Sequence, residues 1–406
     1  MAVGNNLFPN MPVISGCRLT ACAAGVRYKN RPDLVLMEFC PEAITAGCFT
    51  QNAFQAAPVI VAKKNLTSAK PRYFLINSGN ANACTGQQGL EDANASCQFV
   101  AESSHVDPEQ VIPFSTGVIG ERLNIEAIRD GLPKCFSDLS EKGWKQAAEG
   151  MTTTDTFPKG VTKTVFIDGT PIVINGIAKG AGMIRPDMAT MLSYVVTDAV
   201  VSQETLQQLC SIAVNKSFNR ITVDGDTSTN DAAMLVATRQ ADNNRIDSLD
   251  SPAGKLFADA VIEVFEQLAQ LLVRDGEGAT KFVTVRVLGA ASESDALAVA
   301  YAVAESPLVK TALFASDPNW GRLVMAIGKS GVADLDQNKI RLWLGDQLVV
   351  EQGQVAQDYT EQKGQQVLNQ EEILVAVDLA MGDHTESVWA CDFSHEYVSI
   401  NADYRS

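Results

Sequence analysis

Histidine is scarce in this chain of 406 residues, which contains only His105, His384 and His395. The G-x-S-x-G motif, which places a nucleophilic serine on a sharp turn, is also missing. A hydrolase that pairs serine with histidine therefore lacks its characteristic residues here. We expect each histidine to be a surface or structural residue.

Runs of lysine and arginine and long apolar runs are missing as well. Asp and Glu total 48 against 32 Lys and Arg, a formal net charge of −16, which disfavours nucleic acid as a partner. No apolar run approaches the ~18 residues that a membrane span needs. The first residues lack the basic and apolar regions of a signal peptide. We therefore expect a cytoplasmic protein with neither nucleic acid nor membrane as a partner.

Motifs for metals and nucleotides are incomplete. The nine cysteines form no C-x-x-C pair and no zinc spacing, so we expect most of them to be small buried hydrophobes. The segment "AIGKSG" (326–331) resembles the end of a phosphate-binding loop, but Leu323 stands where its first glycine would be. In "DGDTSTND" (224–231), Thr229 replaces the glycine of a calcium loop, so we interpret this segment as a turn that bonds its own backbone. We predict no metal site.

Apolar residues, by contrast, make up 46% of the chain, enough for two domains or one large α/β unit. The runs "PVIVAKK" (58–64) and "RYFLINSG" (72–79) are predicted strands. Two further runs in 164–176 meet at Asp168-Gly169, which predicts a hairpin because glycine accepts the positive φ of a type I′ turn.

The second half alternates strands and helices. A strand is predicted directly after Thr190, and Ser202 can cap a helix that follows it. Ser251-Pro252 begins a longer helix that ends near "RDGEG", and 305–307 begins another. The final run, 397–406, has strand composition. No linker divides the chain, so we place the boundary in the Gly-rich segment before Thr190, between 1–189 and 190–406.

What remains is hydroxyl chemistry without histidine. A threonine can act as a nucleophile when its own N-terminal amine takes its proton, since an α-amino group has a pKa of about 7.7–8.0. An internal threonine gains such an amine only if the preceding peptide bond is cut. The junction Ala189-Thr190 is a candidate for self-cleavage by attack of the Thr190 hydroxyl on the Ala189 carbonyl. The alternative is that these residues merely start a strand.

Seven separated sequence blocks, which occur in the same order as in a known family, show a family resemblance. They are "NSGNANA" (77–83), "PFSTGVIGE" (113–121), "KGAGMIRPDMATML" (179–192), "TVDGDTSTND" (222–231), "VRDGEGATK" (273–281), "DPNWGR" (317–322) and "INADYRS" (400–406). Together they closely resemble the ornithine acetyltransferase family of arginine biosynthesis, over nearly the whole chain.

The resemblance implies a two-domain layered α/β fold of the self-processing ornithine acetyltransferase and aminopeptidase type. It implies cleavage before Thr190 into an α chain (1–189) and a β chain (190–406) that stay intertwined, and a heterotetramer of two α and two β chains. The implied activity is ping-pong acetyl transfer from N-acetylornithine to glutamate, which yields ornithine and N-acetylglutamate. Acetyl-CoA is a possible second donor, and the exchange needs no metal or organic cofactor.

The resemblance also implies roles for single residues. Thr190 is the nucleophile that carries the acetyl group, and Thr116 and Gly117 form the oxyanion hole. The substrate-binding positions are Lys179, Glu277, Asn401, Ser406 and, with Thr190, one threonine of "MTTTDT" (151–156). The family usually has "MTTDT" there, which leaves Thr153 and Thr154 as alternatives.

Two alternatives stay open at this stage. A self-processing N-terminal-nucleophile aminopeptidase would use the same logic with water as the acceptor. A non-catalytic binding protein would never be cut.

Overall fold

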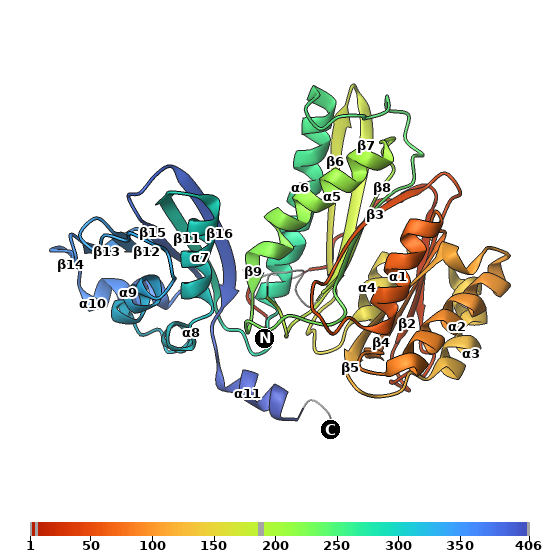
Figure 1. Ribbon diagram of the computed structural model, residues 1–406, viewed down its shortest axis with the longest axis horizontal. Helices are drawn as coiled ribbons and strands as arrows, with labels where there is room; N and C mark the ends of the chain where they lie inside the picture. Colours follow the sequence, from red (N-terminus) through yellow and green to blue (C-terminus); the bar gives the residue numbers. More distant parts are fainter. Residues whose placement is uncertain (1, 5–6, 186–190, 404–406) are drawn as a thin grey trace.

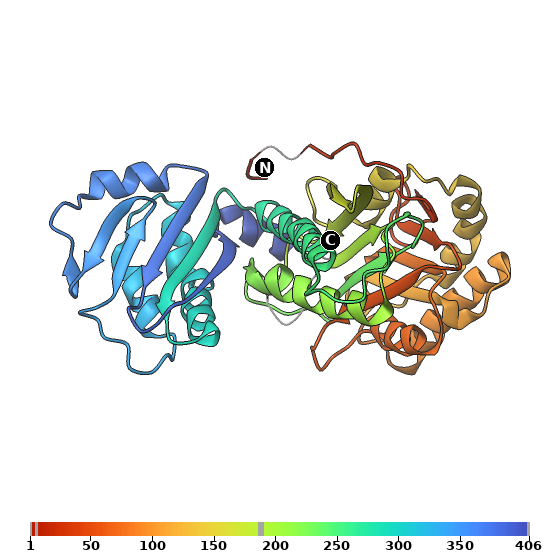
Figure 2. The same cartoon turned by 90° about the horizontal axis from the view of Figure 1, so that it is seen from above.

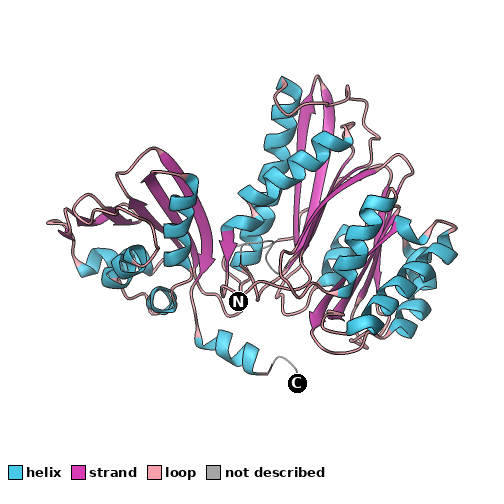
Figure 3. Cartoon of the chain, viewed as in Figure 1, coloured by secondary structure: helices cyan, strands magenta, loops and turns pink. Residues whose placement is uncertain are grey.

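The computed structural model describes residues 2–4, 7–185 and 191–403 (Figure 1). Two lobes lie side by side in both views of the ribbon (Figures 1 and 2). The larger lobe contains a four-stranded and a five-stranded sheet, and the smaller lobe is built on a seven-stranded sheet. Helices cover the outer faces of the sheets, so the predicted layered α/β fold is confirmed (Figure 3).

The four-stranded sheet has the order β1-β2-β4-β5, with β4 and β5 parallel and the other pairs antiparallel. Its strands are β1 (Cys17–Cys22), β2 (Leu34–Phe39), β4 (Tyr73–Asn80) and β5 (Val111–Val118). The helical segments of this part are α1 (Ala57–Ser68), α2 (Gly86–Ser104), η1 (Pro108–Gln110), α3 (Ile125–Asp138) and α4 (Trp144–Met151).

The five-stranded sheet has the order β3-β10-β8-β7-β6. Its strands are β3 (Ile44–Phe49), β6 (Lys159–Ile167), β7 (Thr170–Lys179), β8 (Leu192–Thr197) and β10 (Ala232–Ala237). The helices α5 (Gln203–Lys216) and α6 (Pro252–Arg274) pack on one face. The other face packs on the four-stranded sheet, where the rings of Phe74, Phe114 and Tyr194 meet. Both faces of β8 and β10 are covered, so all their residues are buried.

The smaller lobe has the strand order β14-β13-β12-β15-β11-β16-β9. Its strands are β9 (Ile221–Thr222), β11 (Phe282–Ala290), β12 (Arg341–Leu344), β13 (Gln347–Glu351), β14 (Gln354–Val355), β15 (Glu372–Asp378) and β16 (His384–Cys391). Its helices are α7 (Glu293–Ala304), α8 (Pro307–Phe314), α9 (Trp320–Gly328) and α10 (Glu361–Leu368). The short helix η2 (Phe218–Arg220) places Phe218 in the core of the larger lobe, and α11 (His395–Ala402) extends away from the seven-stranded sheet (Figure 1).

Several local predictions are confirmed. Asp168 and Gly169 both have positive φ in the turn between β6 and β7, as the type I′ hairpin requires. The Ser202 side chain accepts a hydrogen bond from the Thr205 N–H and caps α5. Ser251 caps α6 in the same way, by accepting from the Gly254 N–H.

Two predicted strands are helices. Residues 58–64 lie in α1, where the buried residues Pro58, Val61, Ala62 and Asn65 recur at i, i+3, i+4 and i+7, the spacing of a helix. The strand predicted for the end of the chain is also wrong, because His395–Ala402 form the helix α11. Ser394 caps this helix by accepting a hydrogen bond from the Glu396 N–H. No residue of α11 is buried, so its apolar side chains give no inward face that could have revealed the helix.

The junction between residues 189 and 190 falls in the connection from β7 to β8, which are antiparallel neighbours. In the five-stranded sheet, β8 and β10 lie between β3 on one side and β7 and β6 on the other. Strands from 190–406 are thus flanked by strands from 1–189, and the two segments share one core. The cut itself stays a prediction, since Ala189 and Thr190 lie outside the described residues.

Among the described residues, no single helix has the length and apolar composition needed to cross a membrane. The pair α7 and α8 meets that test only when taken together, and it is bent by 56°.

Candidate active site

A pocket of about 100 Å³ lies where the ends of β5 and β7, the segment after α6 and the helix α11 come together. Every described residue that the sequence predicts for the site lines this pocket: Thr116, Gly117, Thr153, Thr154, Lys179, Glu277 and Asn401. These residues are spread over 286 positions of sequence (116–401), and only the fold brings them together. Ala189, Thr190 and Ser406 lie outside the described residues.

Thr116 and Gly117 are held at the end of β5 by a bulge against β4. Asn80 pairs with both Thr116 and Val118, and Gly79 pairs with Gly117. Gly117 has φ +135, and a Cβ there would lie 2.2 Å from the Gly79 carbonyl carbon. Only glycine fits this close approach, which leaves its backbone beside a small hydroxyl in the pocket wall.

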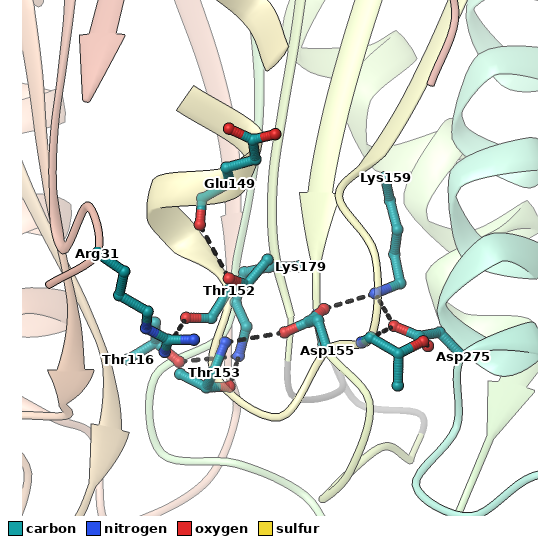
Figure 4. Close-up of polar contacts among 11 residues, drawn as sticks. Arg31, Thr116, Glu149, Thr152, Thr153, Asp155, Lys159, Lys179 and Asp275 are labelled. Carbon is teal, nitrogen blue, oxygen red and sulfur yellow. Dashed lines mark hydrogen bonds and ion pairs between the residues drawn. The ribbon is translucent and has the colours of Figure 1, made fainter. Parts of the chain in front are cut away.

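Lys179 is the last residue of β7, and the residue is only 3% exposed. The Nζ atom donates to the Thr116 Oγ1 at 3.0 Å and to the Thr153 Oγ1 at 3.2 Å (Figure 4). Burial lowers the pKa of Lys179, and the negative charge of Asp155 opposes this effect. The lysine therefore joins the predicted oxyanion hole to the loop that carries the threonines.

The three threonines of the loop at 152–154 differ in their contacts. The Thr152 hydroxyl donates to the Glu149 carbonyl at the end of α4, and the Thr152 carbonyl accepts from Arg31 (Figure 4). The Thr152 hydroxyl therefore bonds to the end of α4, whereas the Thr153 hydroxyl contacts Lys179. Thr154 lines the pocket too.

Glu277 gives the pocket an acidic side, and Asn401 lies beside it. The Asn401 Nδ2 donates to the Glu277 Oε2 at 2.7 Å, which ties α11 to the segment after α6. The Glu277 N–H donates to the Ala181 carbonyl, and a Cβ on Gly182 would lie 2.5 Å from the Glu277 carboxylate. A glycine at 182 therefore leaves the space that this carboxylate occupies.

Sequence reasoning missed a buried ion cluster behind the pocket. Lys159 Nζ lies 2.5 Å from Asp155 and 2.6 Å from Asp275, and all three side chains have no exposed surface. Burial alone would raise the pKa of Asp155, but the charges of Lys159 and Lys179 outweigh it and hold the pKa below its ordinary value. No motif signals this cluster, because Asp275 joins the nearby pair of Asp155 and Lys159 only after folding.

The ion cluster fixes three segments of the pocket wall (Figure 4). Asp155 accepts from the backbone N–H groups of Thr153 and Gly180, and Asp275 accepts from the N–H of Thr156. Gly180 follows Lys179 directly, and Asp275 lies two residues before Glu277. The cluster thus holds the lysine, the threonine loop and the glutamate segment in one frame.

Replacing Lys159 with methionine tests this frame. We expect Lys159→Met to lower the free energy of unfolding by roughly 3–5 kcal/mol, because it leaves two buried carboxylates without their cation. Urea unfolding measures the loss. Lys163→Met, on the same strand, is the matched control: the Lys163–Glu263 pair is 37% and 44% exposed, so its loss should cost only about 0–1 kcal/mol. Equal losses in the two variants would show that the buried cluster does not stabilise the fold.

The segment 224–231 also contributes more than the predicted turn. Asp226 N–H bonds to Asp224 and Asn230 N–H bonds to Ser228, as expected of a turn that bonds its own backbone. In addition, the Asn230 Nδ2 donates to the carbonyls of Ala81 and Ser115, next to Thr116. Asp231 is buried and accepts from the N–H of Met191, and burial raises the pKa of its carboxyl. The turn-like sequence of this segment does not reveal that Asn230 and Asp231 bond to distant parts of the chain.

The remaining negative predictions concern histidine, cysteine and metals. All three histidines are exposed and none lines the pocket. Six of the nine cysteines are buried. In the described part of the chain no three His, Cys, Asp or Glu side chains are grouped as metal ligands would be.

The fold and the pocket together define the class of protein. The pocket combines hydroxyl groups, closely spaced backbone groups, a buried lysine and a glutamate. The protein is an enzyme equipped for acyl transfer, with donors suited to an oxyanion and charges suited to an amino-acid substrate.

The chain belongs to the ArgJ family, whose profile matches residues 18–406. It is 51% identical over 409 residues to the arginine biosynthesis bifunctional protein ArgJ of Pseudomonas fluorescens, and the match covers all of both chains. The ArgJ protein of Psychrobacter arcticus is also 51% identical, over 407 residues and all of both chains. A crystal structure of the Bacillus halodurans ArgJ protein is 40% identical with a TM-score of 0.51, and covers 52% of this chain and 99% of that one.

Proposed function

We propose that this enzyme of arginine biosynthesis transfers an acetyl group from N-acetylornithine to glutamate through an acetyl ester on Thr190. One observation supports this most: a single pocket contains Thr116 and Gly117 together with the buried Lys179 and Glu277. Acyl transfer to and from an amino acid needs both oxyanion donors and charged groups that hold a carboxylate and an ammonium.

The nucleophile is produced by self-cleavage. The Thr190 Oγ attacks the Ala189 carbonyl carbon, the C–N bond breaks, and the freed amine takes the proton. Water then hydrolyses the resulting ester, which leaves a carboxylate on Ala189 and a free amino group on Thr190. That amino group is the base for the later steps, since its pKa of about 7.7–8.0 keeps a useful fraction neutral near pH 7.

Acetyl transfer then follows in two halves. The Thr190 Oγ attacks the acetyl carbonyl of N-acetylornithine, the amide C–N bond breaks, and ornithine leaves with the proton on its amine. The amine of glutamate attacks the ester and restores the Thr190 hydroxyl. Thr116 and Gly117 stabilise the oxyanion in both halves. The steps require a nucleophile, a base and oxyanion donors, so the proposal includes no metal or organic cofactor.

Each charged group of the substrate is assigned to a side chain of opposite charge. Lys179, with Thr153 beside it, binds a carboxylate, while Glu277 and Asn401 bind an ammonium, with Ser406 contributing from the chain end. Thr153 is preferred over Thr154 because its hydroxyl contacts Lys179.

Further properties belong to the same proposal. Acetyl-CoA is a second acetyl donor, a role compatible with the word "bifunctional" in the relatives' names. Two α and two β chains form a heterotetramer, which would have twice the 43.5 kDa of one chain. We propose that it works in the cytoplasm.

We expect Glu277→Gln to raise KM for N-acetylornithine and for glutamate about tenfold. The amide keeps the shape of the side chain but gives up the charge-assisted bond to ammonium, a difference of ~1.4 kcal/mol. Steady-state kinetics with each substrate varied in turn measures the change. Glu263→Gln on the exposed face of α6 is the control and should leave both KM values unchanged. Wild-type KM values in Glu277→Gln would remove Glu277 from substrate binding.

A self-processing aminopeptidase is the competing function. It would discharge the same acyl ester to water at a rate that does not depend on an added amine. The dependence of discharge on glutamate therefore separates the two activities.

A further inference from the structure

The Lys179 ammonium contacts hydroxyl groups rather than a carboxylate. Its Nζ lies 3.0 Å from the Thr116 Oγ1 and 3.2 Å from the Thr153 Oγ1, and the residue is 3% exposed. Among the described residues no carboxylate oxygen lies within 4.0 Å of this nitrogen, whereas Lys159 contacts two carboxylates. Burial and the charge of Lys159 lower the pKa of Lys179, while Asp155, Asp231 and Glu277 act on it through their charge and favour its protonated form.

The direction of the bond between Lys179 and Thr116 follows from the chemistry of the two groups. An ammonium group has three hydrogens and no lone pair, so it can only donate. The Thr116 oxygen therefore accepts, and its own single hydrogen is left to point elsewhere. Within the described part of the chain, no acceptor for that hydrogen is found among the hydrogen bonds of Thr116.

A hydroxyl that accepts from a cation is a stronger donor than a free hydroxyl. The positive charge draws electron density from the oxygen, so the remaining O–H becomes more positive at its hydrogen. This effect is larger between buried groups than in solution, and both Lys179 and Thr116 are buried. The cation thus strengthens the one bond that a developing oxyanion would accept from Thr116.

The backbone fixes this pair of side chains. Thr116 is held by the bulge between β4 and β5, and Lys179 pairs with Leu192 at the end of β7. The N–H of Gly180, next to Lys179, is bound by Asp155 at 2.8 Å. The lysine is therefore anchored both on its strand and at the residue that follows it.

We propose that Lys179 is a positioning residue of the oxyanion hole, which orients and polarises the Thr116 hydroxyl, in addition to binding a substrate carboxylate. This inference rests on the proposed function, because it takes Thr116 to be an oxyanion donor. The ammonium has three hydrogens, so the bonds to Thr116 and Thr153 leave one for a carboxylate.

An acetyl donor that has no carboxylate distinguishes the two roles of Lys179, carboxylate binding and polarisation of the Thr116 hydroxyl. 4-Nitrophenyl acetate is such a donor: the Thr190 Oγ attacks its ester carbonyl, the bond to 4-nitrophenolate breaks, and the proton of Thr190 passes to its own amine. A lysine that only binds a carboxylate has nothing to bind in this reaction. A lysine that polarises Thr116 still acts.

The experiment measures the single-turnover burst of 4-nitrophenolate from processed protein. Rates are normalised to the fraction of β chains that mass spectrometry shows to be acetylated. Wild type is compared with Lys179→Met, Thr116→Ala, the double variant and Lys163→Met as a control for loss of a lysine on the neighbouring strand β6.

We expect Lys179→Met to slow the burst roughly 10- to 100-fold and Thr116→Ala to slow it more, with Lys163→Met at the wild-type rate. The double variant should be no slower than Thr116→Ala alone, because the lysine acts through that hydroxyl. A wild-type rate in Lys179→Met, or effects that multiply in the double variant, would overturn the inference.

Failure of the proposed function gives a different result. If Thr116→Ala also reacts at the wild-type rate, Thr116 is not an oxyanion donor and the proposed site itself is wrong. If Lys179→Met does not fold or is not cleaved, Lys179→Gln carries the same test, since its amide restores a neutral donor without the charge. We expect Lys179→Gln to be slowed as well, and a wild-type rate in this variant would equally overturn the inference.

Discussion

Replacing Thr190 with alanine leaves the chain uncut and without acetyltransferase activity. Without the hydroxyl there is neither a group to attack the Ala189 carbonyl nor an oxygen to carry the acetyl ester. Wild-type protein should give two bands on a denaturing gel, at about 20 and 23 kDa, in proportion to residues 1–189 and 190–406 of the 43.5 kDa chain. Thr190→Ala should give one band at full length.

Thr190→Ser is the matched control for this change. It keeps a hydroxyl and a potential N-terminal amine, so it should be cut and should retain measurable transfer activity. An active wild-type protein that runs as a single full-length band would show that the nucleophile is not made by cleavage at this junction.

Thr116→Ala should lower kcat by roughly 10²–10³, the loss expected when one oxyanion donor is removed. The structure adds an effect on stability, because Lys179 is buried and donates to this hydroxyl. Loss of the acceptor should lower the free energy of unfolding by about 1–3 kcal/mol. Steady-state kinetics and urea unfolding measure the two effects.

Thr116→Ser keeps the hydroxyl and loses only a methyl group, so it should stay within a few-fold of wild type in kcat. The comparison separates the hydroxyl from the space it fills. A Thr116→Ala enzyme with unchanged kcat would leave the Gly117 backbone N–H as the only candidate for the oxyanion hole on β5.

Much of the fold could be predicted wherever the local sequence agrees with its tertiary surroundings. The Asp168-Gly169 turn requires a positive φ whatever packs around it, and Ser202 and Ser251 supply caps that work within one helical turn. Helix α1 was wrongly predicted because Val59, Ile60 and Val61 are typical strand residues. Packing of its inner face overrides that preference. Helix α11 lies exposed, so its sequence had no apolar face to show.

The site could be predicted only in part. The residues that line the pocket came from the family resemblance, and the structure brings all the described ones together. The cluster of Asp155, Lys159 and Asp275 could not be predicted, because its third member, Asp275, lies 116 residues from Lys159 and an ion pair at that distance in sequence has no local signature. Asn230 was hidden in the same way, since a turn sequence does not reveal that an amide also reaches two distant carbonyls.

The central claim is that Thr190 carries the acetyl group between two amino acids, and the mass of the intact chains tests it most directly. Processed protein incubated with N-acetylornithine alone should gain one acetyl group, about 42 Da, on the β chain, since a covalent intermediate accumulates when its acceptor is withheld. Adding glutamate should remove the label. A label on the α chain, or one on the β chain that decays equally fast with and without glutamate, would contradict this function.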